Sequence, residues 1–297
     1  MKLTKIIALI LALTFALTAF AACAGKTTTE DQSSESQADV AAAAKVKTVD
    51  ISLTDELYAF GVNKDQPELL EKTNEYIAQI KADGTLEAIV AKYFSENGSP
   101  AVVKSAEEDS SKDQLVVATN AAFPPFESTE GADYTGIDME IMDGLAKFLG
   151  KELVIKNVAF EAVFSTVDAG YADITASGIT VNESRKEFVN FTDTYYTASQ
   201  IIIAKADDAA FDACATLEEV EAVLNGLGTD VTIGVQKGTT GQYYVEGDAD
   251  WEFPGLPCSC KAYDSGALAV NDLVNGNIKY VIIDEAPAKS IAASVNE

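Results

Sequence analysis

Short apolar segments alternate with segments of helical periodicity from Leu115 to the end of the chain, and this alternation constrains the fold more than any other feature. The runs Leu115–Thr119, Gln200–Ala204 and Tyr280–Ile283 are typical of buried strands. Helical segments lie between them, and glycines such as Gly150 mark where these segments end. Strands that alternate with helices predict parallel sheets covered by helices on both faces, which is an α/β fold.

The segment 45–96 has a different order of elements. Val46–Ile51 and Tyr58–Val62 are predicted strands, and Pro67 opens a predicted helix that a second, shorter helix follows. Residues 97–114 are polar and predict a linker. Nothing after this linker resembles the segment, so the sequence shows no internal repeat.

The N-terminal residues have the pattern of a secretion signal. Lys2 and Lys5 precede an apolar run from Ile6 to Ala22. A positive start followed by such a run predicts a signal peptide over residues 1–22 and export from the cytoplasm. The run is short for a spanning helix, and a retained anchor helix is the alternative.

Cys23 follows two alanines and resembles the lipid-attachment site of bacterial lipoproteins. Lipidation of Cys23 would anchor the exported protein to the cell membrane, whereas cleavage after Ala19-Phe20-Ala21 would release it. Residues 24–44 contain no aromatic residue and only one β-branched aliphatic residue, Val40. Such a segment cannot bury enough apolar surface to fold, so residues 23–44 are predicted to be a disordered, lipid-anchored tether.

Charge and composition exclude several functions. The chain has 21 basic and 47 acidic residues, and this excess of negative charge repels phosphate backbones, so we expect no nucleic-acid partner. It contains no histidine, which excludes Ser-His-Asp and Cys-His catalysis and His-ligated metal sites. We expect no metal and no cofactor. Cys214, Cys258 and Cys260 are expected to be free thiols or to share one disulfide.

Five segments carry a resemblance to a known family. They are LVVATNAAFPPFE (115–127), YTGIDMEIMDGLAKFLG (134–150), DITASGITVNESRKEFVNFTDTYY (173–196), IGVQKGTTG (233–241) and NGNIKYVIIDEAPA (275–288). In this order they resemble the amino-acid-binding solute-binding proteins of ABC transporters. The resemblance implies a two-lobed α/β fold of the type II periplasmic-binding-protein kind, an amino acid as ligand, and the permease of an ABC importer as partner. It also implies a monomer without catalytic activity.

The first part of the chain resembles the end of that family. Val46–Phe94 is similar to the family's C-terminal strands and helices, which in the family follow the region matched by 275–288. The simplest interpretation is circular permutation, with 45–96 as the displaced C-terminal part and 97–114 joining the old ends. A truncated gene duplicate, or exchange of this segment between two chains, is the alternative.

The resemblance also divides the chain into lobes. Residues 115–204 and most of 45–96 would form the first lobe, and residues 205–297 the second. Crossovers near Ser52–Leu53 and Ala204–Lys205 would form the hinge.

Two charged residues are candidates for holding a free amino acid. Arg185, the only arginine in the chain, stands where the family binds the ligand's carboxylate, and a guanidinium offers two parallel donors to such a group. Asp284 follows the apolar strand Tyr280–Ile283 and is expected to hold the ligand's ammonium group. A surface ion pair for Arg185 and a helix N-cap for Asp284 are the alternatives.

The remaining candidates surround these two. Ser177, Gly178 and Thr180 match the family's first-lobe contacts to the ligand, and Thr239 and Thr240 match its second-lobe contacts to the carboxylate. Ordinary turn chemistry is the alternative for all five.

The side chain of the ligand has its own candidate contacts. Phe123 and Phe160 match the family's aromatic walls. Asn120 stands where relatives often carry an aspartate that recognises the ligand side chain, and Gln236 is a possible second contact. A neutral Asn120 favours glutamine, cystine or another uncharged polar amino acid over lysine and arginine.

Two other functions remain alternatives. Secreted dehydratases of prephenate-like substrates use the same fold, but Asn120, Phe123 and Phe160 offer no basic group for the extra carboxylates of such substrates. A ligand-sensing module is the second alternative.

Overall fold

The computed structural model describes residues 45–95 and 97–297 of the chain. Three predictions lie outside the described residues. They are the signal peptide over residues 1–22, lipidation of Cys23 and the tether over residues 23–44. Within the part that is described, none of the helices combines the length and the apolar character needed to cross a bilayer.

The first of two five-stranded sheets draws its strands from both sides of the linker. In spatial order they are β10 (Val189–Phe191), β3 (Gly61–Asn63), β9 (Ile174–Thr175), β4 (Gln114–Thr119) and β8 (Glu152–Asn157). Strand β4 is parallel to β8 and β9, whereas β3 is antiparallel to β9 and β10. The sheet is therefore mixed, because β3, which comes from the segment 45–96 and not from the alternating part of the chain, runs antiparallel to its neighbours.

Alternate residues of β4 face two different helical layers. Leu115 and Val117 pack in the apolar cluster that contains the buried face of α3 (Ile137–Leu149). Val116 and Ala118 pack on the opposite side, with α4 (Phe160–Asp168). This alternation is the period of two that a strand imposes on its side chains.

Two further helices complete the α3 side of the sheet. They are α1 (Pro67–Ala82), which has a proline in its first turn, and α2 (Thr85–Phe94). Both pack on α3. A small third sheet, β5 (Ala122–Phe123), β6 (Glu127–Glu130) and β7 (Asp133–Thr135), precedes α3.

The second five-stranded sheet is built in the same way. In spatial order its strands are β1 (Val46–Val49), β12 (Gln200–Lys205), β15 (Tyr280–Asp284), β13 (Thr232–Gln236) and β14 (Ser259–Tyr263). Helices α7 (Gly266–Val274) and α8 (Glu285–Asn296) share an apolar cluster with one face, and α5 (Leu217–Asn225) and α6 (Thr240–Glu246) share one with the other. Here too only part of the sheet is parallel, because β12 is antiparallel to both of its neighbours.

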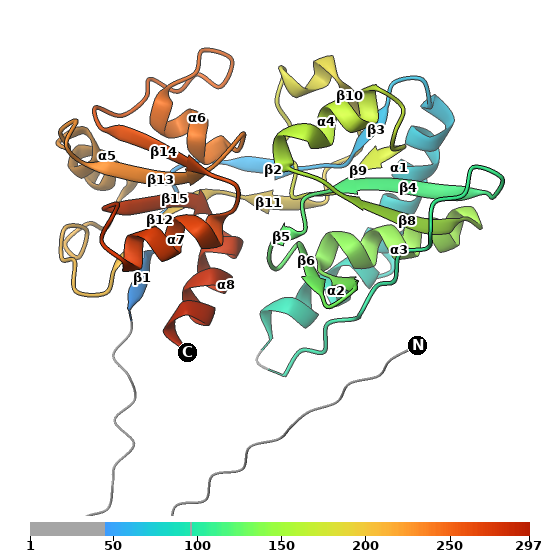
Figure 1. Cartoon of the computed structure of the whole chain (residues 1–297), viewed down its shortest axis with the longest axis horizontal. Coiled ribbons are helices and arrows are strands. Elements are labelled where there is room, and N and C mark those ends of the chain that lie inside the picture. Colours follow the sequence, from blue (N-terminus) through green and yellow to red (C-terminus); the bar gives the residue numbers. More distant parts are fainter. Residues whose placement is uncertain (1–44, 96) are drawn as a thin grey trace, which may run out of the picture. The chain divides into compact units, whose positions relative to one another are not determined.

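Within the described residues the chain passes between the two sheets twice, and the two crossings pair with each other. Strand β2 (Glu56–Tyr58) follows β1 and precedes β3, and β11 (Tyr196–Ala198) follows β10 and precedes β12. The two strands form an antiparallel ribbon, and both can be followed between the sheets in Figure 1.

Two predictions about where the chain crosses between the sheets differ from the structure. The predicted strand Tyr58–Val62 is two strands, because the chain leaves the ribbon at Tyr58 and enters the first sheet at Gly61. The expected boundary at 204/205 falls at the end of β12, which lies wholly in the second sheet. The second crossing therefore comes earlier, at β11.

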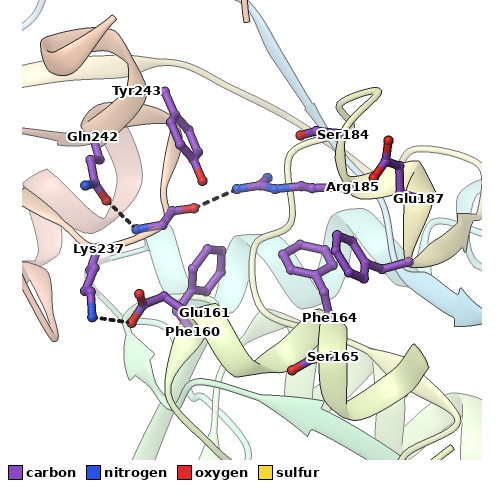
Figure 2. Close-up of a pocket in the computed structure, with 12 residues that line it drawn as sticks. Phe160, Glu161, Phe164, Ser165, Ser184, Arg185, Glu187, Lys237, Gln242 and Tyr243 are labelled. Atoms are coloured by element: carbon purple, nitrogen blue, oxygen red, sulfur yellow. Dashed lines mark hydrogen bonds and ion pairs between the residues drawn. The ribbon is translucent and has the colours of Figure 1, made fainter. Parts of the chain in front are cut away.

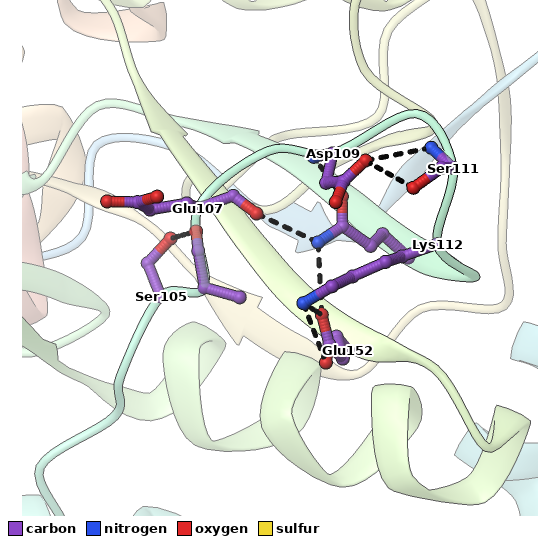
Figure 3. Close-up of polar contacts among 8 residues, drawn as sticks. Ser105, Glu107, Asp109, Ser111, Lys112 and Glu152 are labelled. Atoms are coloured by element: carbon purple, nitrogen blue, oxygen red, sulfur yellow. Dashed lines mark hydrogen bonds and ion pairs between the residues drawn. The ribbon is translucent and has the colours of Figure 1, made fainter.

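The linker 97–114 is held against the first lobe by polar contacts. Val103 is buried and pairs with Tyr134, and the backbone N–H of Ile155 on β8 donates to Ser105 Oγ at 2.9 Å. Figure 3 shows Lys112 reaching Glu152, 3.0 Å away. The linker is thus a docked, extended segment that follows β8.

The start of β1 lies beside the end of α8. The backbone N–H of Lys45 donates to Asn296 Oδ1 at 2.7 Å, and its Nζ donates to the carbonyl of Val295 at 2.7 Å. Asn296 Nδ2 in turn donates to the carbonyl of Val46. Residues some 250 positions apart in the sequence are therefore direct neighbours.

Candidate ligand-binding site

A small cavity lies where the ends of β13 and β15 meet the loop after β9. In the described arrangement the cavity has a volume of only about 10 Å³. Its lining residues, all of them predicted from the sequence, are Phe123, Phe160, Gly178, Thr180, Arg185, Gln236, Thr239, Thr240 and Asp284. The two other predicted residues, Asn120 and Ser177, border the cavity. The backbone N–H of Asn120 donates to Ser177 Oγ at 3.0 Å. The structure thus brings the predicted residues together, and their roles in binding stay predictions.

Arg185 is buried on the short 3-10 helix η1 (Arg185–Glu187). Its guanidinium donates to the carbonyls of Thr180 (2.7 Å) and Gly238 (3.2 Å). Among the residues that the structure describes, no carboxylate forms an ion pair with it. A guanidinium has five N–H donors, so three of them are not used by these two bonds. The surface ion pair considered as its alternative role is not observed.

Aromatic rings surround the guanidinium of Arg185. The rings of Phe160, Phe164 and Trp251 lie 5.1–5.7 Å from its Cζ atom. The faces of such rings attract a cation without neutralising it. Figure 2 shows Arg185 pointing toward the segment that carries Lys237, with Phe160 and Phe164 beneath it. Burial lowers the pKa of Arg185 from its ordinary value.

Asp284 ends β15 and is 4% exposed. Although it occupies the N-cap position of α8, its carboxylate makes no capping hydrogen bond. Instead, the hydroxyl of Tyr58 donates to Asp284 Oδ1. Burial raises the pKa of Asp284 to about 7, and the charge of Glu56 adds to the shift. Burial makes the ionised form of this carboxyl group costly. A positively charged group on a ligand would stabilise that ionised form.

The loop that carries Ser177 and Gly178 rests on two buried acids. Ser177 Oγ donates to Glu127 Oε1 at 3.0 Å, and the Gly178 N–H donates to Asp138 Oδ2 at 2.9 Å. Burial raises the pKa of Glu127 well above its usual range and that of Asp138 to about 7. Gly178 has φ 54°, and a Cβ there would lie 2.8 Å from the Phe123 ring. Only glycine suits this position.

The neutral side chains Asn120 and Gln236 meet across the cavity. Gln236 Nε2 donates to Asn120 Oδ1 at 3.2 Å, and Asn120 Nδ2 donates to the carbonyl of Val158. Gln236 Oε1 is buried and has no hydrogen-bond partner within residues 45–95 and 97–297. A buried acceptor without a donor is costly, so this oxygen favours a ligand that brings an N–H group.

Several contacts join the lobes at this cavity, and three of them involve the segment 236–238. They are the bond from Arg185 to Gly238, the bond from Gln236 to Asn120, and an ion pair between Lys237 and Glu161 at 2.9 Å. The ion pair is solvent-exposed and contributes little. The first two are buried enough to matter, and they show that the described arrangement is a closed one.

Sequence reasoning missed two residues of this region. Glu56 on β2 accepts hydrogen bonds from Thr180 (2.6 Å) and Thr240 (2.8 Å), and its neighbour Tyr58 contacts Asp284. Glu56 is one of 47 acidic residues in the chain, and no local pattern distinguishes it. Only the pairing of β2 with β11 carries it to the cavity.

Two α/β lobes that close over a buried guanidinium and a buried carboxylate define the class of two-lobed solute-binding proteins. The chain belongs to the bacterial extracellular solute-binding proteins, family 3, whose family model matches residues 13–96 and 115–278.

Several known proteins are similar to this chain. The arginine-binding extracellular protein ArtP of Bacillus subtilis is 35% identical over 99 residues, which are 33% of this chain and 39% of that protein. The ABC transporter arginine-binding protein 1 of Escherichia coli is 31% identical over 60% of this chain and 65% of that protein. The chain thus spans less than two thirds of the length of these curated relatives.

A solved structure is similar over a longer part. It is the ancestral amino acid-binding protein AncCDT-1, a precursor of cyclohexadienyl dehydratase. It is 30% identical to this chain with a TM-score of 0.51, and the match covers 62% of this chain and 74% of that one.

Proposed function

We propose that the protein captures a free amino acid between its lobes and delivers it to the permease of an ABC importer. One observation carries this proposal: Arg185 and Asp284, of opposite charge and both buried, line the same cavity from different lobes. A free amino acid carries a carboxylate for the first and an ammonium group for the second. Burial of both charges of a ligand requires such partners.

Closure follows from the same pairing. A zwitterion that touches Arg185 on the first lobe and Asp284 on the second makes both contacts only when the lobes are together. The ligand therefore binds the closed state more tightly and shifts the population toward it. The closed form would be the one that docks on the permease.

The ligand side chain is expected to be polar and to carry an N–H donor. Asn120 is neutral, and the unpaired Gln236 Oε1 needs a donor. The amide of glutamine meets both conditions without adding charge. Relatives named for arginine make arginine the main competitor, because its guanidinium also carries N–H donors.

We propose binding without catalysis. The cavity lining contains one basic side chain, Arg185, which the carboxylate of the amino acid would occupy. Prephenate-like substrates carry a further carboxylate, and the lining has no second cation for it. The dehydratase alternative is therefore less well supported than binding.

We also propose that the domain is circularly permuted and lipid-anchored. Contact between Lys45 and Asn296 supports permutation, since the order 115–297 followed by 45–95 would need only a short join. The docked linker 97–114 would then be the added connection. Lipidation of Cys23, followed by cleavage before it, would anchor a monomeric protein to the outside of the cell membrane.

A thermal-shift screen tests the proposed function. The purified protein is melted alone and with each common amino acid or cystine. A ligand that binds only the folded state at a thousandfold excess over Kd stabilises by roughly 4 kcal/mol. We expect one or a few amino acids to raise the melting temperature, and Arg185→Ala to abolish the shift.

Lys112→Ala is the matched control, because it also removes one positive charge but lies in the linker. It should keep the shift. A cooperative melt that no amino acid moves would rule out the proposed ligand class.

A further inference from the structure

Glu56 is a buried carboxylate that receives hydrogen bonds from both lobes and from Thr54, which lies just before β2. Its Oε1 accepts from Thr54 at 2.6 Å and from Gln200 Nε2 at 2.9 Å. Its Oε2 accepts from Thr180 Oγ1 at 2.6 Å and from Thr240 Oγ1 at 2.8 Å. The Glu56 residue is 5% exposed. Four donors thus meet the two carboxylate oxygens, and each oxygen accepts two hydrogen bonds.

The two threonines on Oε2 come from opposite sides of the cavity. Thr180 follows β9 of the first lobe, and Thr240 begins α6 of the second. Their hydroxyl oxygens are 3.4 Å apart. Both residues line the cavity, and both also line a separate pocket behind it that contains Glu56. The threonines therefore form a wall between Glu56 and the cavity.

The direction of the two hydroxyl protons follows from this arrangement. A hydroxyl has one proton to donate and two lone pairs to accept with. Because each threonine donates its proton to Glu56, only lone pairs remain for the cavity. Asp284 adds a further acceptor to the same lining. Three acceptors side by side fit an ammonium group, which has three N–H donors and no lone pair, and they repel a carboxylate.

We propose that Glu56 is a positioning residue that turns the hydroxyls of Thr180 and Thr240 into acceptors for the ligand's ammonium group. This inference rests on the proposed capture of an amino acid. It changes the role of Thr240, whose hydroxyl was expected to contact the carboxylate. The carboxylate is left to the free N–H donors of Arg185. Glu56 itself does not touch the ligand, because it lies behind the threonines.

A ligand pair tests the proposal. The amino acid that binds the wild-type protein is compared with its α-hydroxy acid, in which a hydroxyl replaces the ammonium group. In Glu56→Gln the amide N–H₂ can no longer accept, so the threonine facing it turns its proton toward the cavity. We expect the preference for the amino acid over the hydroxy acid to fall about tenfold, the size of one lost hydrogen bond to a charged group. Binding of the hydroxy acid should change little.

The control for folding is Glu140→Gln. Glu140 is also a buried carboxylate with several donors, Lys92, Tyr93 and the Ala101 N–H, but it lies in α3 away from the cavity. It should leave the preference unchanged. A fall in this control equal to that in Glu56→Gln would make the effect one of general destabilisation and overturn the proposal.

A double-mutant cycle separates positioning from simple loss of charge. In a background with Thr180→Val and Thr240→Val there is no hydroxyl to turn, so adding Glu56→Gln should alter the preference by less than about threefold. A tenfold fall in both backgrounds would mean that the charge of Glu56 acts on the ammonium directly, against the proposal. No fall in either background also overturns it.

The failure of this inference is distinct from failure of the proposed function. If the wild-type protein binds no amino acid, the proposed function fails. If it binds one and Glu56→Gln keeps the full preference, only the role of Glu56 fails. Should Glu56→Gln not fold, the Val double variant serves instead, since it must lose the preference for the amino acid if the hydroxyls accept from the ammonium group.

Discussion

The affinity for the amino acid should depend on pH through Asp284. Burial raises the pKa of this carboxyl group to about 7 in the ligand-free protein, and Glu56 adds to the shift. An ammonium group binds the ionised carboxylate, so ligand binding must expel the proton wherever Asp284 still holds it. The affinity therefore rises with pH until Asp284 is ionised and then levels off.

The magnitude follows from the distance between the pH and the pKa. At pH 5 the carboxyl group lies two units below its pKa of about 7. Each unit corresponds to 1.36 kcal/mol, so the Kd at pH 5 should be about 100-fold weaker than above pH 8, or about 2.7 kcal/mol. Near pH 7 the loss should be about twofold, because half of the molecules hold the proton.

Isothermal titration calorimetry between pH 5 and pH 8 measures both quantities. Repeating each titration in two buffers of different ionisation enthalpy counts the protons released, which should be near one at pH 5 and near zero at pH 8. Asp284→Asn is the control: it should bind weakly and show a flat profile over this range. A Kd that is equal at pH 5 and pH 8, or tighter at pH 5, would refute the assignment of Asp284 to the ammonium group.

Two further predictions concern the fold. Leu145→Ala removes a fully buried side chain of α3 and should lower the free energy of unfolding by about 2–5 kcal/mol in urea, whereas the exposed Lys147→Ala should change it by less than about 0.5 kcal/mol. A chain that begins at Leu115 and continues from Glu297 through a short linker into Lys45 should melt cooperatively and prefer the same amino acid; failure to fold would count against permutation.

The strands and helices were largely predictable because they depend on local patterns. Apolar runs predicted β4, β12 and β15, and Pro67 predicted the start of α1, which begins at that residue. The pairing of strands was not predictable in the same way. The run Gln200–Ala204 is apolar enough to be buried in either sheet, so its side-chain pattern does not say which lobe it joins.

The candidate site shows the same division. Arg185 and Asp284 stand in motifs whose resemblance to a family gave them roles, and the structure places both in one cavity. Glu56 belongs to no such motif. Its place at the cavity depends on the register of β2 with β11, a long-range pairing that neither periodicity nor composition records.

Under the proposed permutation, the two junctions between the rearranged segments would lie outside the ribbon that connects the lobes. The contact of Lys45 with Asn296 lies within the second lobe, and the linker contacts Tyr134, Ile155 and Glu152, all within the first. Within residues 45–95 and 97–297, the chain connection between the two lobes runs through the β2–β11 ribbon. Rotation of one lobe against the other would bend that ribbon and stretch neither junction. Under the proposed permutation, the order of the segments would therefore change while the bending element between the lobes stays the same.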